Sequence, residues 1–208
     1  MRRWGLAVLA VVLYNSWVAW PLNGDPGVLL GYISELAAAD QPFSWFFRTA
    51  DYAAAAVYAV IAALGWRGWA GWLGRRSRHV AVALMVVAVG TALDATFNLP
   101  CAESRDAACA AAPSIQRHLH EVASVVVSSG QVATIGLVAW GRSVRRGWTR
   151  AVKAVASLAV LVAVLLVTTA VAPYLWPGSQ GPVQIVQIVL CSVWVGYLAW
   201  RLPGRRRG

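Results

Sequence analysis

The sequence is poor in charged side chains, and in acidic ones above all. Only 12% of its 208 residues are charged, whereas 59% are hydrophobic. A typical soluble domain carries about 25% charged residues. A chain this apolar cannot cover a water-exposed surface with polar groups. We therefore expect one integral membrane domain over residues 1–208, with no room beside it for a soluble domain of ordinary size.

Lysine is almost absent, which bears on the meaning of the net charge of +10. Lys153 is the single lysine, and the arginines stand in short clusters between apolar runs. This distribution is typical of membrane topology signals and not of a basic groove for nucleic acid. We expect no nucleic-acid partner, and a lipid bilayer as the surroundings of the chain.

Six apolar runs are long enough to cross a hydrocarbon core of about 30 Å at about 1.5 Å per residue. They cover approximately residues 4–20, 45–65, 80–99, 119–140, 151–172 and 183–202. The sequence thus predicts an all-α bundle of six transmembrane helices. The first run could instead be a signal peptide, but no small-x-small cleavage site follows it. We interpret it as a retained helix.

The distribution of charge predicts the orientation of these helices. Fifteen of the 18 basic residues fall in residues 1–3, 67–78, 142–153 and 201–207, on one side of the predicted bundle. The positive-inside rule makes that side cytoplasmic, together with both termini. All eight acids fall in the opposite loops or in the adjoining helix ends. They are Asp25, Glu35, Asp40, Asp51, Asp94, Glu103, Asp106 and Glu121.

The first extracytoplasmic loop is the longest, and its pattern predicts a short helix. Residues 23–27 form a turn-rich string, and residues 28–36 follow it. Leu29, Leu30, Ile33 and Leu36 would share one face of a helix, with Ser34 and Glu35 displaced from it. A short helix lying at the membrane surface fits this pattern.

Polar residues within the second and third predicted spans are candidates for a functional site. Asp51 lies near the outer end of the second span, and Asp94 and Asn98 lie one turn apart in the third. An ionisable residue inside a span is costly and is a functional hypothesis by default. The alternative is structural, with Asp94 reaching toward the membrane surface or bonding a neighbouring backbone.

The fourth span carries a continuous polar stripe. Its members are spaced by three or four residues, and they are His120, Ser124, Ser128 and Gln131. In lipid, such a stripe must face other helices or a water-filled cavity. Hydrogen bonding between helices is the simpler interpretation for each serine. The sixth span adds Gln184 and Gln187 on one face, which would either complete the cluster or join two helices.

His120 permits a chemical interpretation of this cluster. Imidazole binds metals and transfers protons near neutral pH. With Asp94 and Glu121 nearby, a catalytic metal site with three protein ligands, such as zinc, is one interpretation. The spacing alone does not demand it, since the chain has no His-x-x-x-His, Cys-x-x-Cys or Gly-x-Ser-x-Gly motif.

Two of the three cysteines, Cys101 and Cys109, share the loop between the third and fourth spans. That loop is predicted to be extracytoplasmic, where disulfides form and persist. We therefore predict a Cys101–Cys109 disulfide that stiffens the loop above Asp94 and His120.

Several short motifs resemble a bacterial membrane family known as domain of unknown function 998. They are Gly31-Tyr32-Ile33-Ser34-Glu35-Leu36, Phe46-Phe47, Phe97-Asn98-Leu99-Pro100 and His120-Glu121-Val122-Ala123. The resemblance implies six helices and a bacterial cytoplasmic membrane. It also places Ser34, Glu35, Asp94 and His120 at the family's motif positions.

A more distant similarity is to the alkaline ceramidase and adiponectin-receptor group of hydrolases. Those proteins hold zinc with Ser, Asp and three His side chains and hydrolyse lipid amides. This sequence departs from that pattern, because it has only three histidines and His79 is predicted to be cytoplasmic.

Three functional hypotheses follow. The first is a metal-assisted hydrolase of a lipid or small amphiphile, with His120 as ligand or base, Asp94 and Glu121 as ligands or acid/base partners, and Ser34 as a polarising donor. The second is a non-enzymatic binder or transporter of a small ligand. The third is a structural subunit of a membrane complex. Further pocket residues are predicted to be Glu35, Asp51, Asn98, Ser124, Gln131, Gln184 and Gln187.

Overall fold

The computed structural model describes residues 3–204, and within them no strand is found. The basic residues Arg2, Arg205, Arg206 and Arg207, used above for orientation, lie outside the described residues. Six helical segments of the described chain are long and apolar enough to span a membrane. The prediction of an all-α six-helix bundle is therefore confirmed.

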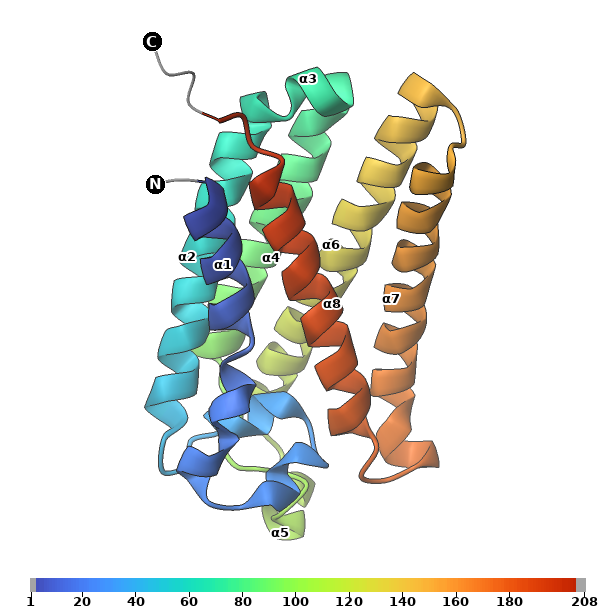
Figure 1. Ribbon diagram of the computed structural model, residues 1–208. Helices are drawn as coiled ribbons and strands as arrows, with labels where there is room; N and C mark the ends of the chain where they lie inside the picture. Colours follow the sequence, from blue (N-terminus) through green and yellow to red (C-terminus); the bar gives the residue numbers. More distant parts are fainter. Residues whose placement is uncertain (1–2, 205–208) are drawn as a thin grey trace.

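The spanning helices begin and end close to the predicted boundaries. They are α1 (Arg3–Tyr14), continued by a 3-10 helix (Ser16–Asn23), α2 (Ser44–Gly68), α4 (Ser77–Thr96), α6 (Ile115–Arg146), α7 (Arg150–Leu175) and α8 (Gln180–Trp200). A short helix, α3 (Ala70–Leu73), precedes α4. The start of α1 and the end of α8 lie at the same end of the bundle as α3 (Figure 1).

The six long helices form a closed ring in chain order. Each packs against the next one along the chain, and α8 packs against α1 to close the ring. Consecutive helices joined by short loops are antiparallel neighbours, as the sequence predicts. Two glycines allow α4 and α6 to approach closely. A Cβ on Gly90 would lie 2.9 Å from Val127, and one on Gly130 would lie 2.8 Å from Val87.

Side-chain caps fix the points at which helices begin. Ser114 accepts a hydrogen bond from the backbone N–H of Arg117 (3.2 Å) and begins α6. Thr149 does the same for Val152 (3.3 Å) at the start of α7. Such caps satisfy backbone donors that the first turn of a helix leaves unpaired.

The half of the ring near α3, called the basic half below, is filled by apolar side chains. Ile61, Leu84, Trp194 and Leu198 belong to one buried cluster there. Trp194, which lies mid-span in the sequence, donates its indole N–H to Thr134 Oγ1 at 3.0 Å. The centre of the bundle is therefore dry and closed in this half.

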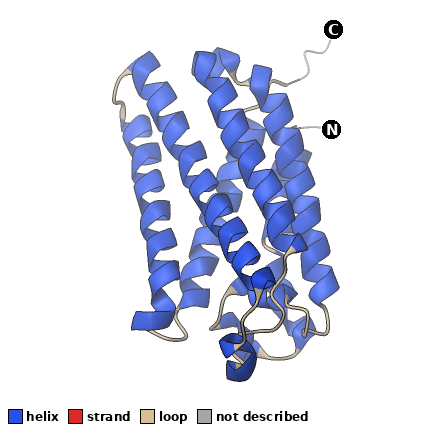
Figure 2. Cartoon of the chain, turned by 180° about the vertical axis from the view of Figure 1, so that it is seen from behind, coloured by secondary structure: helices blue, strands red, loops and turns tan. Residues whose placement is uncertain are grey.

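The opposite half, called the outer half below, is covered by the two long loops, which include α5 (Ala107–Ala111) (Figures 1 and 2). The predicted helix over residues 28–36 is present as two 3-10 helices, Pro26–Leu29 and Ile33–Ala37, and not as one helix on the membrane surface. Glu35 is the physical reason, because it is only 1% exposed and bonds inside the loop layer. Its carboxylate accepts hydrogen bonds from the Tyr32 N–H and from Ser104.

The second long loop is bound to the first at several points. The Cys101–Cys109 disulfide is present, which confirms the prediction. Asp40 accepts a hydrogen bond from the Ala102 N–H at 3.1 Å, and Arg105 forms an ion pair with Asp25 at 2.8 Å. The two loops thus form one cap over the outer half of the ring.

Candidate functional site

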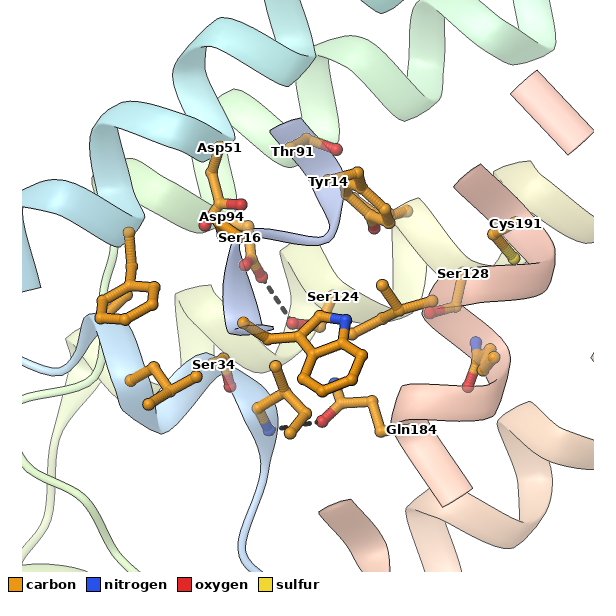
Figure 3. Close-up of a pocket in the computed structure, with 18 of the residues that line it drawn as sticks. Tyr14, Ser16, Ser34, Asp51, Thr91, Asp94, Ser124, Ser128, Gln184 and Cys191 are labelled. Atoms are coloured by element: carbon orange, nitrogen blue, oxygen red, sulfur yellow. Dashed lines mark hydrogen bonds between the residues drawn. The ribbon is translucent and has the colours of Figure 1, made fainter. Parts of the chain in front are cut away.

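A cavity of about 100 Å³ lies inside the ring, between the cap and the apolar core of the basic half. Its walls come from α1, α2, α4, α6, α8 and the first outer loop (Figure 3). The polar lining residues are Tyr14, Ser16, Ser34, Asp51, Thr91, Asp94, Ser124, Ser128, Gln131, Gln184 and Gln187. The apolar part of the wall includes Trp17, Phe47 and Ile188.

Two side chains of α6, those of Ser124 and His120, contact Asp94 of α4. Ser124 donates a hydrogen bond to Asp94 Oδ1 at 2.5 Å. His120 Nδ1 lies 3.2 Å from the backbone oxygen of Asp94 and 3.5 Å from its Oδ1. His120 is 5% exposed and lies behind the cavity wall, to which Asp94 itself belongs. The structure therefore brings together Asp94, His120 and Ser124, which the sequence proposed as members of one site.

Asp51 faces the same part of the cavity without such support. In Figure 3 its side chain, on α2, lies next to that of Asp94. Among the described residues it takes part in none of the side-chain hydrogen bonds or ion pairs that hold Asp94. Arg48, one turn earlier on α2, donates to the backbone oxygen of Ala95 at 3.1 Å instead. The carboxylate of Asp94 is thus held by neighbouring side chains, and that of Asp51 is not.

Gln131 is the most deeply buried polar group of the lining. It is 1% exposed, and both its Nε2 and its Oε1 lack a hydrogen-bond partner within the described chain. More than 90% of buried polar groups in proteins are paired, so an unpaired buried amide requires an explanation. Gln131 lines the cavity, so its amide can pair with a polar molecule there.

The two glutamines of α8 have partners and also help to build the wall. Gln184 Oε1 accepts a hydrogen bond from the Ile33 N–H at 2.7 Å, which binds the cap to α8. Gln187 Oε1 accepts one from Thr169 Oγ1 at 3.4 Å, which joins α8 to α7. Ser34, next to Ile33, reaches the cavity from the cap.

His120 does not line the cavity, and three more of the proposed site residues lie outside it. Asn98 donates to the backbone oxygen of Ala37 at 3.1 Å, and Glu35 bonds within the cap, so both join loops. Burial raises the pKa of Glu35 above its usual 4.5, although the hydrogen bonds that it accepts lower the pKa in part. Glu121 is exposed and pairs with His118 at 3.2 Å, away from His120.

This arrangement does not fit a catalytic zinc ion. Asp94 and His120 supply two ligands, whereas catalytic zinc sites use three protein ligands and one open position. Glu121, the third ligand that the sequence offered, faces away. Within residues 3–204, no group of three or more His, Cys, Asp or Glu side chains is placed to bind a metal ion. We therefore derive no step through a metal.

The sequence matches the family described as "Protein of unknown function (DUF998)" over residues 5–201. The match covers nearly the whole chain. The chain belongs to this family. Searches of curated proteins and of solved structures gave no match.

In this DUF998 chain, sequence reasoning missed the contribution of the first helix to the cavity. Tyr14 and Ser16 line the wall, and Asn15 between them donates to Ser192 Oγ of α8 at 2.8 Å. The signal was present as a polar string, Tyr14-Asn15-Ser16, near the outer end of an otherwise apolar run. Thr91 of α4, one turn before Asp94, was missed as well.

Proposed function

We propose that this membrane protein binds a small polar solute in the cavity of its outer half. The observation that carries the proposal is Gln131, whose amide is buried and unpaired on the cavity wall. Leaving a buried polar group unpaired costs about 1–3 kcal/mol. A polar solute that hydrogen-bonds to this amide recovers part of that cost, which favours an occupied site.

The size of the cavity limits what it can hold. The cavity volume is about 100 Å³. Sites for drug-sized ligands are about 300–1,000 Å³. A solute of a few non-hydrogen atoms fits, whereas a whole lipid does not. The cavity therefore favours a small solute over the lipid or large amphiphile that the hydrolase hypothesis requires.

The hydrogen-bond order also favours binding over hydrolysis. A serine nucleophile needs a general base that takes its proton, and that base is usually a histidine. Here Ser124 donates to Asp94 Oδ1, and His120 Nδ1 lies 3.5 Å from the same oxygen. The serine is therefore bonded to the aspartate and not to the histidine, and the two α6 side chains hold this carboxylate in place.

The apolar core of the basic half supports entry of the solute from the outer side. Leu84 and Trp194 belong to the cluster that closes the ring below the cavity. A polar solute would have to cross this dry layer to reach the cytoplasmic end. We therefore propose a binding protein that is loaded through the capped, extracytoplasmic end.

Thermal unfolding of the purified protein in a neutral detergent tests the proposal. The solutes are acetamide, urea, formate, acetate and methylammonium, each added over a concentration series at constant ionic strength. Binding to the folded state alone raises the midpoint with concentration, by about 2.7 kcal/mol of stability at 100 times Kd. We expect at least one solute to do this in the wild type and to lose its effect in Gln131→Met.

Gln41→Met is the matched control, since Gln41 lies in the cap and its amide contacts only the exposed Asp40 side chain. This variant should respond to the solute as the wild type does. If none of the solutes shifts the wild-type midpoint, or if Gln131→Met responds as strongly as the wild type, the binding proposal is refuted.

A further inference from the structure

We infer that the solute is a small primary alkylammonium ion, whose charged nitrogen lies between Asp51 and Asp94. This inference rests on the proposed function and names the class of solute that the same cavity takes. It follows from three properties of the wall: its two carboxyl groups, its unpaired acceptor and its aromatic side chains.

The wall carries two carboxyl groups and no strongly basic side chain. Asp51 and Asp94 both line the cavity, and no lysine or arginine is among the lining residues. His120 is the one basic side chain in contact with either carboxyl group, and it contacts Asp94. Asp51 is therefore left without a basic partner among the described residues.

An isolated carboxylate inside a membrane-spanning bundle is expensive. Such groups are stable when they pair with a cation or bind a proton. Among the described residues Arg48 forms no ion pair with Asp51, and its Nε donates to the backbone oxygen of Ala95. A cation that enters the cavity is attracted by both carboxylates at once. The Asp94 side chain, fixed by Ser124 and His120, offers it a preformed contact.

The remaining wall distinguishes an organic ammonium ion from a metal cation. A primary ammonium group has three N–H donors. Asp51 and Asp94 supply carboxyl acceptors on the wall, and the side-chain oxygen of Gln131 is a further unpaired acceptor in the same cavity. Tyr14, Trp17 and Phe47 add aromatic surface, and aromatic rings attract alkylated ammonium ions. One to three carbons fill the rest of a cavity of about 100 Å³.

The test is direct binding of radiolabelled methylammonium to the purified full-length protein in nanodiscs, with the ionic strength held by N-methyl-D-glucamine chloride. We expect saturable binding in the wild type. Asp51→Asn should weaken it at least tenfold, because the substitution removes the carboxyl group that pairs with the ammonium ion and retains the shape of the side chain. Asp106→Asn is the matched control and should bind as the wild type does. Asp106 is exposed and is the N-cap residue of α5, and asparagine also serves as an N-cap residue.

Competition by unlabelled solutes completes the test. Ethylammonium should compete with labelled methylammonium, whereas acetamide at the same concentration should not. Equal affinity in Asp51→Asn and the wild type would overturn the inference, as would displacement by sodium at the concentration at which ethylammonium displaces. The same experiments test the proposed function separately. If acetamide or urea stabilises the protein and methylammonium does not bind, solute binding stands and the ammonium inference fails.

Asp94→Asn provides a second variant should Asp51→Asn not fold. It keeps a side chain for Ser124 to contact and removes the other carboxylate charge. A loss of methylammonium affinity of at least tenfold is expected here too. Unchanged affinity in this variant contradicts the inference.

Discussion

Replacing Gln131 by methionine should stabilise the empty protein, although it removes a polar contact group from the cavity. Gln131 is 1% exposed, and neither its Nε2 nor its Oε1 is paired within the described chain. An unpaired buried group costs about 1–3 kcal/mol, and methionine has nearly the same length without that cost. We therefore expect Gln131→Met to raise the free energy of unfolding by about 1–3 kcal/mol.

The measurement is equilibrium unfolding in mixed micelles, with the protein dialysed free of small amines and amides. Gln180→Met is the matched control. Gln180 is also buried, but its Oε1 accepts a hydrogen bond from the Gly178 N–H at 2.9 Å. Its replacement should destabilise the protein by about 0.5–1.5 kcal/mol, the usual net value of one hydrogen bond. A destabilisation by Gln131→Met similar to that of Gln180→Met would refute the reasoning, because Gln131 would then have a partner within the folded chain.

The remaining predictions concern the cap and the Asp94 pair. Serine at Cys101 and Cys109 should lower stability by about 2–3 kcal/mol in chemical unfolding, because the disulfide closes a loop with a sequence separation of 8 residues; an unchanged midpoint would contradict this. The raised pKa of Glu35 means that the folded state holds this proton more tightly than the unfolded state. Stability should therefore fall as the pH rises from about 4.5 through the raised pKa, and Glu35→Gln should flatten that slope. Asp94→Asn and His120→Ala should reduce methylammonium affinity non-additively, with a coupling of about 0.5–3 kcal/mol, whereas additive losses would show that the two side chains act independently.

The long helices of the fold could be predicted because a segment that crosses a lipid bilayer must be long and apolar. Residues 151–172 are almost wholly apolar, and the structure places them within α7 (Arg150–Leu175). The disulfide followed from the compartment and the shared loop. The cap could not be predicted in detail, since the sequence pattern around Glu35 indicates an exposed acid in a loop. Its burial depends on Ser104, which lies 69 residues away in the sequence.

The polar stripe of the candidate site could be predicted because its residues share one helix. The stripe of His120, Ser124 and Gln131 follows from helical periodicity, and two of these residues line the cavity while His120 holds Asp94. Glu121 sits beside His120 in sequence, but successive residues of a helix point about 100° apart, which places Glu121 with His118 outside. The contribution of α1 to the cavity wall depends on the packing of α8 against α1, which no local sequence pattern indicates.

The most direct test of the account is a cryo-electron microscopy structure of the protein in nanodiscs, determined with and without methylammonium. With the solute, the account predicts density inside the cavity within hydrogen-bond distance of Asp51, Asp94 and the Gln131 amide. Without it, ordered water should occupy the same space. A collapsed cavity in both structures, with Gln131 hydrogen-bonded to a neighbouring helix, would contradict the claim that this chain holds a solute there.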